Sequence, residues 1–99
     1  MAETAQNIRV RDNTEAGRFE IVVAGEVAGF SAYQRFGASI VFTHTQINPD
    51  RSEHGLGTQL VQTALDEISH STSLRVVAQC PFVAHFIEEH PNYQRLLIR

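Results

Sequence analysis

The sequence contains no lysine, only one cysteine and no long apolar run, and each scarcity excludes a class of protein. All eight basic residues of the 99-residue chain are arginine, and the formal net charge is −3. Because no basic block or arginine-rich helix is present, nucleic-acid binding has little electrostatic support. No apolar stretch approaches the roughly 20 residues that a membrane-spanning helix needs. We therefore expect neither a nucleic-acid partner nor a membrane partner.

Cysteine and metal-binding patterns are equally sparse. Cys80 is the only cysteine, which excludes an internal disulfide and fits a reducing compartment. The first residues, MAETAQN, lack the basic and apolar regions of a signal peptide, so we expect a cytoplasmic protein. His85 and His90 are five residues apart and do not share a helix face, and no Cys/His cluster has zinc spacing. We expect no metal site.

Length and hydrophobic content predict one domain with one modest core. The chain has 99 residues, of which 42% are hydrophobic. Residues 1–7 are polar and lack periodicity, so we expect them to be disordered and residues 8–99 to form the domain. Four segments rich in β-branched, aromatic or alternating apolar residues come first, separated by short turns. These segments, which predict an antiparallel meander, are residues 8–12, 18–24, 27–36 and 39–47.

After the fourth segment the apolar period changes from that of a strand to that of a helix. A helix is predicted from Leu56 to about Ser71, with apolar positions at Leu56, Leu60, Val61, Ala64, Leu65 and Ile68. Residues 74–78 read as a fifth strand, parallel to the fourth because a helix joins them. Pro81 suits the first turn of a second helix over 82–89, and residues 93–98 form a last short strand or helical turn. The predicted fold is α/β, with a mixed sheet: an antiparallel meander followed by a β-α-β crossover.

The turn between the fourth strand and the first helix is the strongest local signal. Gly55 and Gly57 stand where the helix opens, and glycines there leave backbone N–H groups free to hold a phosphate at the positive end of the helix dipole. The spacing is neither that of a P-loop nor that of a dinucleotide fingerprint. Taken alone, G-x-G fits a tight turn without a ligand equally well.

The order of the elements and several short motifs make the pattern more specific. These are His44-Thr45 with Pro49, Glu53-His54-Gly55-Leu56-Gly57, Leu60-Val61, Ala64-Leu65, Cys80-Pro81-Phe82-Val83, Phe86-Ile87 and His90-Pro91-Asn92-Tyr93. With them, the chain resembles the GNAT superfamily of acyl-CoA-dependent N-acyltransferases from about Ile8 to Tyr93. It looks most like the small single-domain, YjdJ-type branch.

The resemblance implies a binding mode for acetyl-CoA or another acyl-CoA. Strands four and five splay apart, the pantetheine arm pairs along strand four, and the second helix flanks the arm. The pyrophosphate rests on the amides of the turn after strand four. The cofactor-binding residues that this implies are His44, Thr45, Gln46, Ile47, Ser52, Glu53, His54, Gly55, Leu56, Gly57, Thr58 and Phe86.

Two residues of the turn depart from the pattern of the family. Ser52 stands where an arginine or glutamine is usual, and Glu53 stands where a glycine is usual. The first change removes a positive charge and the second adds a negative one beside a phosphate, so we expect weaker CoA binding. His54, at a usual lysine position, supplies a partial charge when protonated.

Three residues are candidates for the chemistry, each with a structural alternative. Cys80, at the end of strand five, is a nucleophile that takes up the acyl group, a thiol near the substrate that is never acylated, or a small core residue. His44 is a general base for the amine, an activator of Cys80, or a strand histidine with a structural hydrogen bond. Tyr93 is a proton donor to the leaving thiolate or an aromatic packed on the core. A strand-four backbone N–H is expected to polarise the carbonyl.

The sequence therefore predicts an N-acetyltransferase that acts on an amine, either a small molecule or a protein. The alternative is a degenerate CoA-binding module that acts as a sensor or interaction partner. We expect a monomer or weak dimer, with the acceptor amine held partly by a partner or a second subunit.

Overall fold

A computed structural model describes residues 7–51, 55–70 and 73–97. The first half of the chain forms the predicted meander of four strands: β1 (Ile8–Asn13), β2 (Arg18–Val23), β3 (Glu26–Phe36) and β4 (Ser39–Ile47). The second half contains α1 (Leu56–His70), β5 (Arg75–Ala78), α2 (Pro81–Glu89) and a 3-10 helix, η1 (Pro91–Leu96). None of the described helices is both long and apolar enough to cross a membrane.

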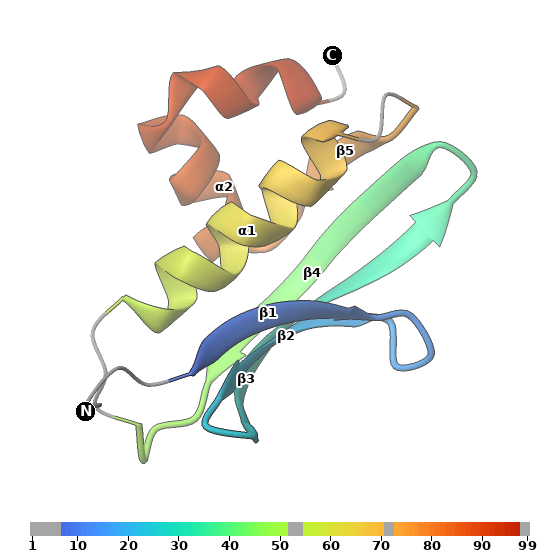
Figure 1. Cartoon of the computed structure of the whole chain (residues 1–99). Helices are drawn as coiled ribbons and strands as arrows, with labels where there is room; N and C mark the ends of the chain where they lie inside the picture. Colours follow the sequence, from blue (N-terminus) through green and yellow to red (C-terminus); the bar gives the residue numbers. More distant parts are fainter. Residues whose placement is uncertain (1–6, 52–54, 71–72, 98–99) are drawn as a thin grey trace.

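The strands form one mixed sheet in the order β1-β2-β3-β4-β5 (Figure 1). The pairs from β1 to β4 are antiparallel, and β4 pairs with β5 in parallel. This topology confirms the predicted meander and β-α-β crossover. The C-terminal segment, predicted as a strand or a helical turn, is η1 followed by a parallel bridge from Leu97 to Val76.

Four strand ends differ by one residue from the predicted boundaries, and the end of β2 has a clear physical reason. Ala24 belongs to the turn between β2 and β3 rather than to the strand, because Ala24 and Gly25 both have positive φ, at 51° and 85°. Two consecutive positive φ values are typical of the two-residue turns that match the twist of a hairpin. At the same end of β2, pairing with the chain before β1 extends to Asn7, whose carbonyl accepts a hydrogen bond from the Ala24 N–H at 2.9 Å.

One hydrophobic core lies between the sheet and the helices. All six apolar positions predicted for the helix stripe are buried in α1. Helix α1 packs across β1 to β4, while α2 packs against β4, β5 and α1. The largest fully buried side chain of the sheet is that of Phe42 on β4. The packing fixes α1 and α2 beside the place where β4 and β5 separate.

Candidate functional site

Strand β5 pairs with only the first part of β4. Their parallel register ends at Phe42 and Ala78. The N–H groups of Gln79 and Cys80 both donate to the Phe42 carbonyl, at 3.0 and 2.9 Å, and the chain then turns into α2. Strand β4 continues to Ile47, and no described strand pairs with this side of it beyond Phe42. The divergence leaves a stretch of strand edge available to an extended ligand.

Helix α1 begins beside this edge with a set of free backbone donors. Gly55 has φ of +76°, a conformation that glycine adopts at little cost, and its carbonyl accepts the first helical hydrogen bond, from the Gln59 N–H at 2.9 Å. The amides from Gly55 to Thr58 therefore have no acceptor inside the helix. The first turn carries no acidic residue. Ser52, Glu53 and His54, which were predicted to complete the turn, lie outside the described residues.

Gly57 is in close contact with α2. A Cβ at this position would lie 2.8 Å from Cζ of Phe82, so the ring packs directly on the glycine backbone. Two cavities flank this contact and share Thr58. The smaller, of about 260 Å³, lies between Thr58 and α2 and is lined by Phe86 among others. The larger, of about 530 Å³, follows the polar side of α1. The predicted residues Gly55, Thr58 and Phe86 thus come together around the start of α1.

Cys80 is only 3% exposed and lies at the end of a polar chain that passes through the half-buried Thr45. Its Sγ donates to Oγ1 of Thr45 at 3.3 Å, and the Thr45 hydroxyl lies 2.9 Å from Oγ of Ser31, which is fully buried. A threonine hydroxyl is not a base near neutral pH. The contact therefore holds the thiol proton in place and does not remove it.

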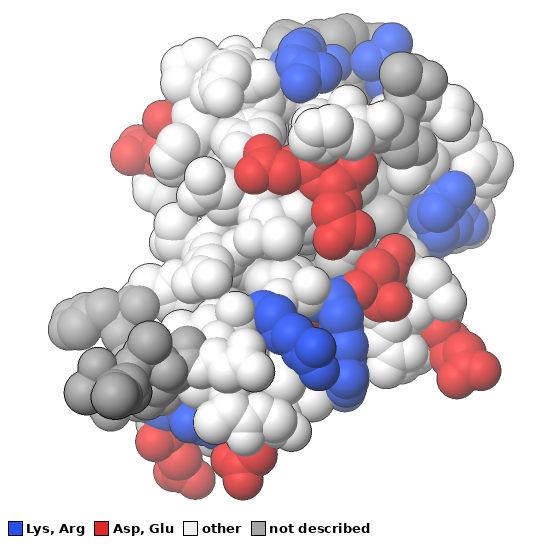
Figure 2. Space-filling model, viewed as in Figure 1, with Lys and Arg blue, Asp and Glu red and all other residues white. Residues whose placement is uncertain are grey.

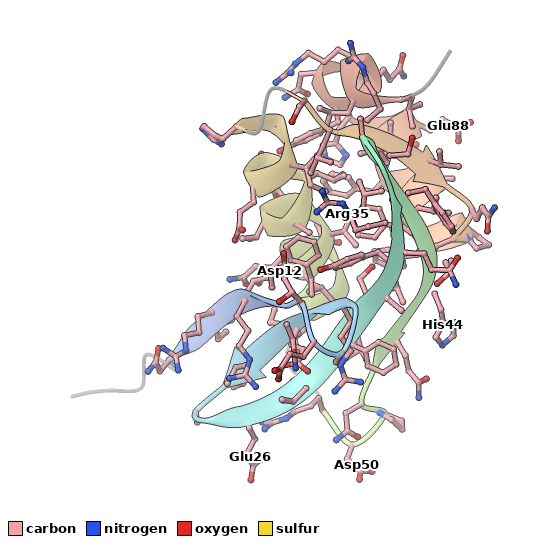
Figure 3. The ribbon with its side chains drawn as sticks, turned by 90° about the vertical axis from the view of Figure 1, so that its right-hand side faces the viewer. Asp12, Glu26, Arg35, His44, Asp50 and Glu88 are labelled. Atoms are coloured by element: carbon pink, nitrogen blue, oxygen red, sulfur yellow. The ribbon has the colours of Figure 1, made fainter. Side chains whose placement is uncertain are left out.

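His44 lies on the other side of the sheet from this chain. Thr45, its neighbour, contacts Cys80, and successive side chains of a strand point to opposite faces. His44 is exposed, packs near Phe30 with ring centroids 6.0 Å apart, and places Nε2 3.3 Å from Oε1 of Gln46. Figure 3 shows its ring projecting from β4 into open space. The structure does not bring His44 together with Cys80, although both were candidates for the same step.

The buried hydroxyl of Tyr93 is directed toward α1. It donates to Oδ1 of Asp66 at 2.5 Å and so links η1 to the middle of α1. This hydrogen bond, together with burial, raises the pKa of Tyr93 above its usual value of 10.0. The hydroxyl is protonated at neutral pH and already has an acceptor within the chain.

Two contacts of this region were not predicted from the sequence. Ser31 lies in an apolar strand, and its partnership with Thr45 depends on the register between β3 and β4. Phe82 follows Pro81 in the first turn of α2, and only the packing of α2 on α1 shows that its ring meets Gly57. No sequence signal indicated either contact. Among the residues that the structure describes, no group of three or more metal-ligating side chains is found.

Comparisons with known proteins identify the family and agree with the fold. A family model described as GCN5-related N-acetyl-transferase matches residues 18–96. A solved structure of similar fold is the NMR solution structure of a GCN5-like N-acetyltransferase candidate from Staphylococcus aureus. It is 19% identical, covers 93% of this chain and 89% of that chain, and has a TM-score of 0.67. At this identity the likeness shows the fold alone. No curated protein matches the chain.

Proposed function

Because the chain belongs to the GCN5-related N-acetyltransferase family, whose members transfer acyl groups from CoA-linked donors, we propose that it moves an acetyl group from acetyl-CoA to an amine. The observation that carries the proposal is the juxtaposition of two features: an unpaired β4 edge beyond Phe42 and the free amides that open α1. An extended thioester arm suits the first feature, and a pyrophosphate suits the second.

The residues fit the donor along its length. Backbone groups from His44 to Ile47 would pair with the pantetheine arm, and Phe86 would flank it from α2. The amides of Gly55, Leu56, Gly57 and Thr58 would hold the pyrophosphate, together with the turn of Ser52, Glu53 and His54. The close contact between Gly57 and Phe82 leaves no room for a side chain at this point of the cradle.

Transfer of the acetyl group to an amine requires few side-chain groups. A neutral amine attacks the thioester carbonyl, a β4 backbone N–H polarises the carbonyl oxygen, and the CoA thiolate leaves. Cys80 has its thiol proton directed at Thr45, which supports the role of a thiol near the substrate over that of a nucleophile. His44 would serve an incoming amine only from the open face of the sheet. Tyr93 would protonate the thiolate only after its hydroxyl leaves Asp66.

A second candidate function is a CoA-binding module without turnover. It is favoured by the positions of His44 and Tyr93, since neither side chain contacts the thiol of Cys80 through a described hydrogen bond. Ser52 and Glu53 favour it as well, because they place less positive charge on the turn than the family pattern does. Binding without transfer to any amine would distinguish this module from the enzyme.

Titration calorimetry with acetyl-CoA, followed by a thiol-release assay over a panel of amines, tests the proposal. Gly57→Ala should weaken binding at least fivefold, because its methyl group meets Phe82 and narrows the cradle. Alanine is the better helix former by about 1 kcal/mol, so the variant should stay folded. Glu67→Ala, at an exposed position on the same helix, is the matched control. Equal binding by wild type and Gly57→Ala would contradict the placement of the cradle.

Intact-mass measurement after exposure to acetyl-CoA tests the role of Cys80. We expect no acetyl adduct on the wild-type chain, and we expect Cys80→Ala to keep most of its turnover. An adduct that is lost in Cys80→Ala, together with abolished turnover, would identify Cys80 as the nucleophile. Tyr93→Phe, measured alongside, should leave kcat unchanged unless its hydroxyl protonates the leaving thiolate.

A further inference from the structure

The smaller cavity beside the start of α1 has an unusual chemical lining. Its walls are Thr58, Phe82, His85, Phe86, Glu89 and His90. Phe82 is 43% exposed, which makes it one of three exposed large apolar side chains in the described structure. The ring of His90 stacks on Phe86 with centroids 4.0 Å apart and planes at 17°. The cavity therefore offers aromatic faces directly beside the free amides of α1.

Two residues of this cavity, His90 and Glu89, offer hydrogen-bond acceptors. Nδ1 of His90 lies 2.8 Å from the Phe86 carbonyl, and since a carbonyl only accepts, Nδ1 carries the hydrogen. In the neutral ring, Nε2 then keeps its lone pair. Glu89 adds an exposed carboxylate to the same lining. Such a lining suits a planar ring with N–H donors and disfavours a second phosphate.

Arginine and lysine are missing from the described lining of both cavities. None of the described residues that line them is an arginine, and the sequence contains no lysine. The guanidinium of Arg51, the arginine that precedes the turn, lies 2.8 Å from the carboxylate of Glu26. In Figure 2 no blue side chain lies over α2 and the first half of α1 on the face shown. A phosphate outside the amide cradle would meet neither arginine nor lysine among the described lining residues.

We propose that the chain recognises the purine base of its CoA donor through Phe82 and the neighbouring rings of Phe86 and His90. We also propose that it does not recognise the 3′-phosphate. This inference rests on the proposed function and concerns the donor end of the same site. The base would stack on the exposed face of Phe82, with its exocyclic amine toward the acceptors of Glu89 and His90. CoA and dephospho-CoA would then be equivalent ligands.

Titration calorimetry with CoA, dephospho-CoA and 4′-phosphopantetheine tests the proposal on wild type, Phe82→Ala and Phe82→Trp. We expect the Kd values of CoA and dephospho-CoA to agree within about threefold, and phosphopantetheine to bind about tenfold more weakly, by the usual strength of base stacking. Phe82→Ala should weaken CoA and dephospho-CoA by about that same factor and leave phosphopantetheine unchanged. Phe82→Trp should keep full affinity for all three ligands.

The control variant is Phe36→Ala, because Phe36 is also an exposed aromatic, at 62%, but ends β3 at the hairpin to β4. It should change none of the three affinities. CoA binding more than tenfold tighter than dephospho-CoA would overturn the inference and leave the proposed function standing. If Phe82→Ala weakened the binding of CoA and of phosphopantetheine equally, the inference would also be overturned and the proposed function would stand. Failure of all three ligands to bind would remove the proposed function and the inference with it.

Discussion

Each face of the sheet carries a polar cluster around a buried residue, and the two clusters differ in charge and in how completely their hydrogen-bonding groups are satisfied. On the face away from α1, Glu20 is 1% exposed and accepts hydrogen bonds from Arg11, Arg18 and Asn13 at 2.8, 2.8 and 3.1 Å. On the helix-covered face, Ser31, Thr45 and Cys80 form the neutral chain described above.

The difference separates a structural cluster from one that borders the site. Both oxygens of Glu20 are engaged by partners on β1 and β2, and the guanidinium of Arg18 also lies 4.6 Å from the centroid of Phe30. The buried carboxylate of this cluster is therefore satisfied by partners within the chain. The neutral chain instead ends at a thiol next to the unpaired edge of β4. We infer that the charged cluster stabilises the meander and that the neutral chain shapes the site.

The largest effect on stability should come from Glu20→Gln. The change leaves two guanidinium groups without their carboxylate, and their partial exposure lets water compensate in part. We expect a loss of about 2 kcal/mol in the free energy of unfolding, measured by urea denaturation. Glu15→Gln, at an exposed turn position, is the matched control and should change stability little. CoA binding by the folded fraction should stay unchanged. A loss of binding would contradict the inference that the charged cluster has only a structural role.

The stability of the protein at acid pH should depend on the cluster around Glu20. Burial by itself would raise the pKa of Glu20, but hydrogen bonds from Arg11, Arg18 and Asn13 outweigh it and hold the pKa below the usual 4.5. A carboxyl group with a lowered pKa in the folded state contributes stability above pH 4.5 and loses it as the pH falls through the folded value. Melting temperature should therefore fall more steeply below pH 4.5 in wild type than in Glu20→Gln. An equal fall in melting temperature below pH 4.5 in wild type and Glu20→Gln would contradict the lowered pKa of Glu20.

The neutral chain should show coupling between its hydroxyls. Thr45→Val removes the acceptor of the thiol and leaves Ser31 buried without this partner, at a cost of about 1 kcal/mol. Ser31→Ala should cost a similar amount, and the double variant should cost less than the sum. Thr43→Val, on the same strand but with a hydrogen bond of 3.4 Å, is the control. Additive losses in the urea-unfolding cycle would mean that the three groups do not act as a chain.

A purely alkaline effect of similar size should come from Tyr33, which also lies on the helix-covered face. Burial, with a hydrogen bond to Asp12 at 2.6 Å, raises its pKa from 10.0 to about 12. Because the folded pKa is the higher one, this contribution is complete below pH 10 and fades as the pH rises toward 12. We expect wild type to lose about 1 kcal/mol by pH 11 from this group. Tyr33→Phe should lose less over the same range in alkaline melting experiments, and equal losses would exclude the effect.

Much of the fold was predictable because the residues that become buried are apolar and recur in the sequence at the period of a helix or a strand. The six apolar positions from Leu56 to Ile68 predicted the helix and its buried face, and all are buried. The turn residues and β-branched segments predicted the order and direction of the strands. The predicted direction of β5 followed from the helical crossover, and its pairing with β4 confirms it.

The faces of the site residues were not predictable, and the reason is a single inserted residue. Tyr33 pairs with Phe42 but Ala32 pairs with His44, so Thr43 is an extra residue on β4. Regular alternation from the buried Phe42 would place His44 on the core face with Cys80. The bulge reverses the alternation, turns Thr45 toward the core and leaves His44 exposed. A bulge depends on the pairing of two strands, and no residue pattern in β4 predicts it.

The sequence by itself determined the strand and helix order, the buried stripe of α1 and the glycines that open it, because each follows from local propensity and apolar period. The tertiary structure alone decided which polar groups meet. The thiol of Cys80 contacts Thr45, 35 positions away, the hydroxyl of Tyr93 contacts Asp66, and Phe82 packs on Gly57. These contacts depend on register and on helix packing, which bring distant residues within a few ångströms of one another.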